Sequence, residues 1–256
     1  MTGRLLLRGM LAGLVAALLS FGFLKLAGES SVDRAIAFET MVDEAKARLS
    51  GGEAAAKGQP APAVLAEPEL VSRTVQAGIG LLTGVIVYST AFGGLFALAF
   101  ALAFRRMADI GPRATSAVLA ALGFVAVYAA PMLKYPANPP SVGLAETIGM
   151  RTSLYFALIL LSLAVMIAVG MLRIRLLPRV GEWNAALIAA GVYIAMMTGI
   201  GLALPDVNEV PEEFPATVLW QFRIASLGGQ VIMWATLGLL FGFLAERLIA
   251  PQSARA

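Results

Sequence analysis

The chain of 256 residues contains no histidine and no cysteine, so any chemistry it performs must rest on other side chains. It has no thiolate, no disulfide and no imidazole to act as a general base or a metal ligand. A metal ion held by this chain alone would be bound by carboxylate, amide, carbonyl or thioether groups, which favour hard cations or weak binding of softer ones. No Walker A sequence, G-x-S-x-G element or histidine metalloprotease motif occurs. We therefore expect neither an enzyme nor a permanently bound cofactor.

Oxygen ligands are most concentrated in the proline-rich segment Pro205–Pro215, which carries several acids and one asparagine. A second proline-rich segment, Lys134–Pro140, contributes Asn138. Carboxylates and amides at this density suit a divalent cation. A solvated acidic loop that binds no ion is the alternative. The predicted metal ligands are Asn138, Asn208 and Glu209, with Asp206 and Glu212 more peripheral.

Three arginines, Arg73, Arg151 and Arg223, each stand at the start of an apolar stretch, at the same expected depth as these acids. A helix N-terminus already carries partial positive charge, so an arginine without a partner is poorly placed there. We expect all three to contact carboxylates or loop carbonyls. If they pair with the acids, the cluster is an ion-pair network that holds the loops together and not an open metal site. The presence of an arginine at the start of three apolar stretches is also compatible with three helical hairpins derived from one ancestor, or with chance.

The composition requires a membrane to position these residues. The chain is 59% hydrophobic and 14% charged, with a mean hydropathy of +0.82. A soluble domain needs roughly a quarter of its residues charged. The net charge of +3 is too small to indicate nucleic acid binding. We expect a single all-α membrane domain of six helices, each long enough to cross about 30 Å of hydrocarbon. They are predicted near Leu5–Leu26, Thr74–Phe104, Arg113–Leu133, Thr152–Leu172, Trp183–Leu204 and Ile224–Ile249.

The distribution of Lys and Arg predicts the orientation of these helices. The N-terminus, the C-terminus and the segments 105–113 and 173–183 are rich in arginine and poor in acids. The positive-inside rule therefore places both termini in the cytoplasm. Because Arg4 and Arg8 open the first stretch, a signal peptide must be considered. Lys25 interrupts the position where cleavage would fall, which favours an uncleaved first helix.

The first outer segment, 27–73, is the longest. Its sequence Ser30-Ser31-Val32-Asp33 resembles a capping box with Ser30 as the N-cap. Apolar residues at helical spacing then predict an amphipathic helix over about 32–49. A flexible linker rich in Gly, Ala, Pro and Glu is expected over about 50–68.

The centres of the six stretches contain no Asp, Glu, Lys or Arg. This argues against an acidic proton relay and against a charged cation site at the middle of the membrane. The more polar intramembrane side chains are Gln76 and Gln230, which we expect to form hydrogen bonds between helices. Two Gly-x-x-x-Gly pairs, Gly80–Gly84 and Gly238–Gly242, are expected to mark close packing within the bundle and not a dimer surface.

Several segments resemble the CbtA family of probable cobalt transporter subunits: Asp33–Ile36, Leu70–Gly84, Lys134–Pro140 and Asn208–Arg223. The most specific parts are Lys134–Pro140, Val71–Gly78 and Asn208–Pro211. The resemblance runs through nearly the whole chain. It implies a bacterial inner membrane protein that takes up cobalt in support of cobalamin synthesis. It also implies a partner, CbtB, which is a small one-helix protein with a histidine-bearing tail.

The chain differs from many members of this family because residues 50–69 contain no histidine. Transient binding of Co²⁺ would then use oxygen ligands, or the histidines would come from the partner. The alternative function is a membrane scaffold, or an accessory subunit of a larger membrane complex, that transports nothing.

Overall fold

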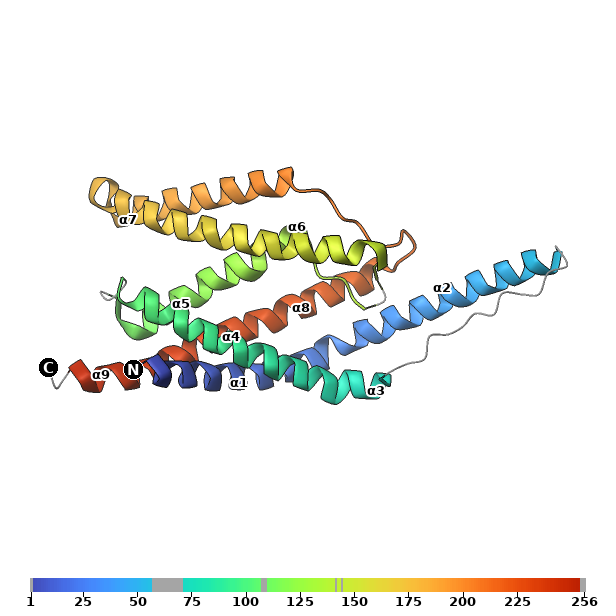
Figure 1. The fold of residues 1–256 in the computed structure, drawn as a ribbon, viewed down its shortest axis with the longest axis horizontal. Coiled ribbons are helices and arrows are strands. Elements are labelled where there is room, and N and C mark those ends of the chain that lie inside the picture. The colour runs from blue at the N-terminus through green and yellow to red at the C-terminus, as the bar shows by residue number, and fades with distance from the viewer. Residues whose placement is uncertain (1, 57–70, 107–109, 141, 144, 254–256) are drawn as a thin grey trace.

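The computed structural model describes residues 2–56, 71–106, 110–140, 142–143 and 145–253, and within these residues all regular secondary structure is helical (Figure 1). This confirms the predicted all-α fold class. Lipid offers backbone N–H and C=O groups no partners, so a spanning segment must satisfy them within its own helix. The helices are, in chain order, α1 (Thr2–Ala27), α2 (Glu29–Ala56), α3 (Arg73–Val75), η1 (Gln76–Gly80), α4 (Leu81–Phe104), α5 (Gly111–Gly123), η3 (Phe124–Ala129), α6 (Ala130–Lys134), α7 (Ala145–Ala203), α8 (Ala216–Thr236), η4 (Leu237–Phe241) and α9 (Gly242–Ser253).

Among the described residues, five helical segments are long and apolar enough to cross a membrane. One of them, α7 (Ala145–Ala203), is divided at a kink into two arms. Helix α7 has 59 residues, which would measure about 90 Å if it were straight. It is instead interrupted at Gly181, where φ is 79° and ψ is 170°, a conformation that favours glycine. Figure 1 shows its two arms side by side as a hairpin. The bundle therefore has the six crossings that the hydropathy predicts. The loop expected at 173–183 is helical up to Val180.

Three of the crossings contain π-helical turns, η1, η3 and η4. In η3 the N–H of Ala130 donates to the carbonyl of Val125, five residues back. Pro131 follows immediately, and it has no N–H for the carbonyl of Val127. The proline thus accounts for the widened turn, and such turns often accompany functional sites because they redirect side chains.

Helices α1 and α4 pack with their backbones almost in contact. A Cβ atom built on Gly9 would overlap the carbonyl oxygen of Gly93, and one built on Gly93 would overlap that of Gly9. The two Gly-x-x-x-Gly pairs singled out in the sequence behave differently. Gly238 packs on α5, where a Cβ would lie 2.6 Å from that of Ala120, so the prediction for the second pair is correct. It is wrong for the first pair, since Gly84 has no neighbouring atom within 4 Å of such a Cβ.

Helix α2 contains the predicted amphipathic segment but is longer at both ends. It begins at Glu29, with only Gly28 between it and the end of α1, so Ser30 lies inside the helix and is not its N-cap. Residues 50–56, expected to be linker, are helical and continue α2. The remainder of the predicted linker, 57–68, lies outside the described residues.

Over residues 29–50 of α2, only the first turns are buried against the bundle. Ala35 packs with Val142, Phe214 and Val218, and Phe38 contacts the ring of Phe214 edge-on at 5.1 Å. Further along, the side chain of Leu49 is exposed, and the helix extends beyond the bundle (Figure 1). The predicted apolar face therefore anchors α2 only at its base.

The main core lies in the half of the bundle near the start of α1 and the end of α9. It is built largely from aromatic rings of α4, α8 and η4. Phe241 contacts Phe96 and Phe100 edge-on, at 5.4 and 5.1 Å between ring centroids. Phe100 and Phe241 are fully buried, so the bundle is tightly closed at this level.

Candidate functional site

The candidate site lies at the end of the bundle that carries Arg73, Arg151 and Arg223, here called the arginine end. The segments 135–144 and 204–215 connect helices at this end, opposite to the start of α1 and the end of α9 (Figure 1). Each arginine occupies the first part of a membrane-crossing segment and contacts oxygen atoms of its surroundings. The arginine end is therefore held together by polar contacts between segments far apart in the sequence.

The most buried of these contacts joins Arg151 of α7 to Glu209. The distance from Arg151 Nη1 to Glu209 Oε2 is 2.7 Å, and the carboxylate is completely buried. Thr147, one helical turn before Arg151, donates its hydroxyl to Glu209 Oε1 at 2.5 Å. Arg151 Nη2 donates to the carbonyl of Pro136 at 3.0 Å. The buried negative charge of Glu209 is thus matched by a guanidinium and a hydroxyl.

A second set of contacts joins segment 135–144 to α8 and to segment 204–215. Arg223 donates to the carbonyl of Ala137 and to Asn138 Oδ1, both at 3.1 Å. The hydroxyl of Tyr135 donates to the carbonyl of Pro205 at 2.8 Å. Lys134 lies 2.5 Å from Asp206, whose carboxylate is 93% exposed. The two connecting segments are therefore fastened to each other and to the helices below.

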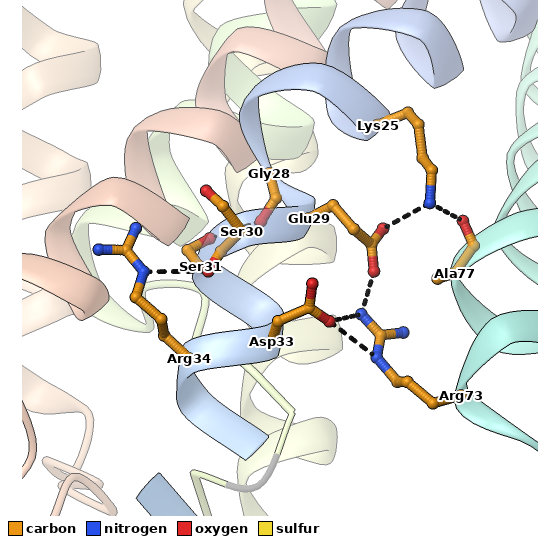
Figure 2. A network of polar contacts seen from close by, with 9 residues as sticks. All are labelled: Lys25, Gly28, Glu29, Ser30, Ser31, Asp33, Arg34, Arg73 and Ala77. Carbon is orange, nitrogen blue, oxygen red and sulfur yellow. Dashed lines mark hydrogen bonds and ion pairs between the residues drawn. The ribbon is translucent and has the colours of Figure 1, made fainter. Parts of the chain in front are cut away.

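Arg73 belongs to a separate network at the junction of α1 and α2 (Figure 2). Its guanidinium contacts Glu29 and lies 3.0 Å from Asp33 Oδ1. Lys25 lies 3.9 Å from Glu29 and donates to the carbonyl of Ala77 at 3.0 Å. Asp33, expected in a capping box, thus joins α2 to the start of α3, and the network connects three segments across the arginine end.

The residues predicted as metal ligands do not form one open cluster. Glu209 contacts Arg151, Asn138 contacts Arg223, and Asp206 contacts Lys134. Asn208 is exposed and accepts a hydrogen bond from the N–H of Val210 at 3.3 Å, and Glu212 is exposed on the following turn. Among the described residues, no group of three or more Asp, Glu, His or Cys side chains could hold a metal ion. The arrangement is the ion-pair network that the sequence offered as the alternative to an open site.

A cleft of about 290 Å³ opens between η3, α6 and the start of α7. Its lining includes Asn138 and Arg151 from the polar network. It also includes three tyrosines, Tyr128, Tyr135 and Tyr155. Sequence reasoning missed Tyr128 and Tyr155, because a tyrosine inside an apolar stretch is equally common in ordinary packing. The only local signal was Pro131, which alters the helix next to Tyr128.

A family described as "Probable cobalt transporter subunit (CbtA)" matches residues 2–246, nearly the entire chain. The chain belongs to the CbtA family. No curated protein and no solved structure matches it. As a CbtA protein it is a multi-pass membrane subunit of a probable cobalt transporter, a role that is not enzymatic and that implies further subunits.

Proposed function

We propose that this CbtA protein supplies the membrane path of a cobalt uptake transporter, while a partner subunit supplies the high-affinity metal ligands. One observation carries this division of roles. The carboxylates Glu209 and Asp206 at the arginine end each contact a basic side chain, yet a cleft opens beside them. Oxygen ligands that are already compensated bind a transition-metal ion weakly. A path without a strong site of its own requires delivery of the ion by another protein.

The partner that meets this requirement is a small one-helix subunit with histidines, of the CbtB kind. Imidazole suits cobalt better than carboxylate or amide groups do, and the chain has no histidine. The transporter would then supply cobalt for cobalamin synthesis. Co²⁺ is the transient cargo in this proposal, and the protein, surrounded by membrane lipid, holds no permanent cofactor and carries out no catalysis.

The ion enters from the outer face of a bacterial inner membrane, at the arginine end. The end opposite to Arg73, Arg151 and Arg223, which carries both termini, has the larger excess of basic over acidic residues. The positive-inside rule assigns that end to the cytoplasm. First contact is with the oxygen atoms of Asn138, Asn208 and Glu209, with Asp206 and Glu212 further out. To bind the ion, the carboxylate of Glu209 must give up its contact with Arg151. The ion therefore stays bound to Glu209 only briefly.

The test is cobalt uptake in cells that express the chain with and without a one-helix, histidine-bearing partner. We expect uptake only with the partner. We expect the double variant Glu209→Gln with Asn208→Ala to lower the uptake rate severalfold. Glu44→Gln, at an exposed pair on α2 that lies 3.5 Å from Arg48, serves as the matched control. Equal uptake by wild type and the double variant would remove this site from the proposal. A folded protein that never transports cobalt would instead point to the scaffold function.

A further inference from the structure

A groove of about 350 Å³ lies at the arginine end between α1, α2 and α8, separate from the cleft beside η3. At its inner end Phe23 of α1 packs on Gly228 of α8, where a Cβ atom would lie 2.5 Å from the phenyl ring. Gly28, between α1 and α2, is buried, and a Cβ atom on it would lie 3.6 Å from that of Ala225. Close contacts between the helices therefore fix the walls of the groove.

The lining of the groove changes from apolar to polar in the outward direction. Phe23 of α1 and Ile224 of α8 belong to its inner part. The outer part is formed by polar and amphipathic side chains of α2 and of the first turns of α8: Ser30, Arg34, Trp220 and Gln221. A phospholipid has the same order, with acyl chains towards the middle of the membrane and a polar head outside.

Trp220 places the outer part of the groove at the level of the lipid headgroups. Its side chain is 65% exposed, although it belongs to a helix that is apolar enough to cross the membrane. Indole rings favour the membrane interface, because they have an apolar body and a polar edge. Ile224, one turn further inward, is also exposed and faces hydrocarbon at that depth. The groove is therefore accessible to lipid along its length.

Arg34 carries a positive charge that no acid in the described part of the chain neutralises. Its Nε donates to the carbonyl of Ser30 at 3.0 Å, and its Nη2 donates to Oε1 of Gln221. Both acceptors are neutral, and the neighbouring Asp33 pairs with Arg73 instead. Figure 2 shows the guanidinium of Arg34 directed away from that pair. A phosphate group would supply the missing negative charge, since its oxygens match the donors of a guanidinium.

We propose that this groove binds an anionic phospholipid from the leaflet at the arginine end, with the phosphate on Arg34 and an acyl chain along Phe23 and Ile224. The described lining contains no acid, so the ammonium group of phosphatidylethanolamine would find no counter-charge. The hydroxyls of a phosphatidylglycerol head can instead form hydrogen bonds with the amide of Gln221. The bound lipid would join α1, α2 and α8 at the base of the projecting helix. This role is independent of the ion that the protein transports.

The first test measures the lipid retained by the full-length protein in mild detergent, by native mass spectrometry. Phosphatidylglycerol and phosphatidylethanolamine are the two probes, and we expect wild type to retain the first more strongly. Arg34→Gln should weaken binding of phosphatidylglycerol about tenfold, the effect of one lost charge-assisted hydrogen bond. Arg48→Gln is the matched control, because it removes the same charge further along α2, at the exposed pair with Glu44. Equal binding by the two variants, or equal retention of the two lipids, would overturn the proposal.

A second pair of variants tests the charge of Arg34 separately from the folding of a variant that lacks it. Gln221→Glu leaves Arg34 in place but puts a carboxylate beside its guanidinium, and it should weaken binding of phosphatidylglycerol as much as Arg34→Gln does. Arg34→Lys keeps the positive charge and should retain most of the binding. Undiminished binding by Gln221→Glu would contradict the role of the charge.

Two further measurements distinguish the lipid from other occupants of the groove. An excess of inorganic phosphate should not displace phosphatidylglycerol, because burial of the acyl chain also contributes to binding. Displacement would identify a site for free phosphate and would count against a lipid. Co-expression with a one-helix partner should leave the lipid bound. Loss of the lipid in that complex would assign the groove to the helix of the partner and refute the proposal.

Discussion

At the scale of single residues, burial distinguishes the ion pairs at the arginine end. The carboxylate of Glu209 is completely buried and depends on Arg151 and Thr147 for compensation. Asp206, at a similar distance from Lys134, is 93% exposed and remains hydrated. An exposed pair contributes little to stability, whereas a buried charge that loses its partner is strongly destabilising. The two pairs therefore have different roles despite their similar geometry.

Replacing Arg151 with alanine should lower the free energy of unfolding by about 3 kcal/mol, because it leaves the charge of Glu209 buried without a partner. Lys134→Ala is the control and should cost less than about 1 kcal/mol, since water solvates Asp206. Chemical unfolding in detergent measures both. Addition of Glu209→Gln to Arg151→Ala should restore part of the loss. Equal effects of the two single variants would contradict the role of burial.

At the scale of helices, the contact between α1 and α4 determines how the first two crossings pack. Association inside lipid gains little from the hydrophobic effect, so helices depend on close approach of their backbones. Gly9 and Gly93 permit this approach, each facing the carbonyl of the other. The two arms of the α7 hairpin are joined by Gly181, whose positive φ of 79° breaks the helix. The chain reverses its direction at this residue.

Gly93→Leu should prevent α1 and α4 from approaching, at a cost of about 3 kcal/mol, because a side chain there overlaps the backbone of α1. Gly84→Leu in the same helix should leave stability nearly unchanged, as its side chain would enter open space. The yield of folded protein and its thermal transition in detergent measure the difference. Similar losses for the two variants would mean that the contact between α1 and α4 does not determine the packing.

At the scale of the whole molecule, the two ends of the bundle differ in character. The end with the start of α1 and the end of α9 carries arginines such as Arg113, which lies 2.5 Å from Glu246, and Arg247, which lies 4.2 Å from the ring of Phe243. The arginine end carries the cleft, the paired acids and the projecting helix α2. Such asymmetry suits a protein that receives a cation on one side and releases it on the other.

This asymmetry leads to a prediction about topology. Fluorescent reporters fused after Arg255 or within Met107–Pro112 should be active in the cytoplasm. The sequence around these positions has an excess of basic over acidic residues, which the positive-inside rule assigns to the cytoplasmic side. Alkaline phosphatase inserted near Gly52 or near Val142 should be active in the periplasm. An inactive alkaline phosphatase near Gly52, together with an active fluorescent reporter at the same position, would refute both the uncleaved first crossing and the charge argument.

Hydropathy and composition determined the class of this protein without any coordinates. An apolar segment in lipid has only its own backbone groups as partners, so length and hydropathy predict helical crossings directly. The same reasoning located Arg73, Arg151 and Arg223 at the starts of crossings, because cations avoid the hydrocarbon. The family resemblance rested on short motifs that lie in or beside these segments.

Only the tertiary structure decided which residues meet. Glu209 is an ion-pair partner of Arg151, 58 positions away, and Tyr128 and Tyr155, from two different crossings, line one cleft. Such contacts depend on the order and rotation of the helices, which hydropathy does not determine when lipid-facing and buried surfaces are equally apolar. The same limit explains the error at Gly80–Gly84. A Gly-x-x-x-Gly pair permits close packing, but only a neighbouring helix makes use of it.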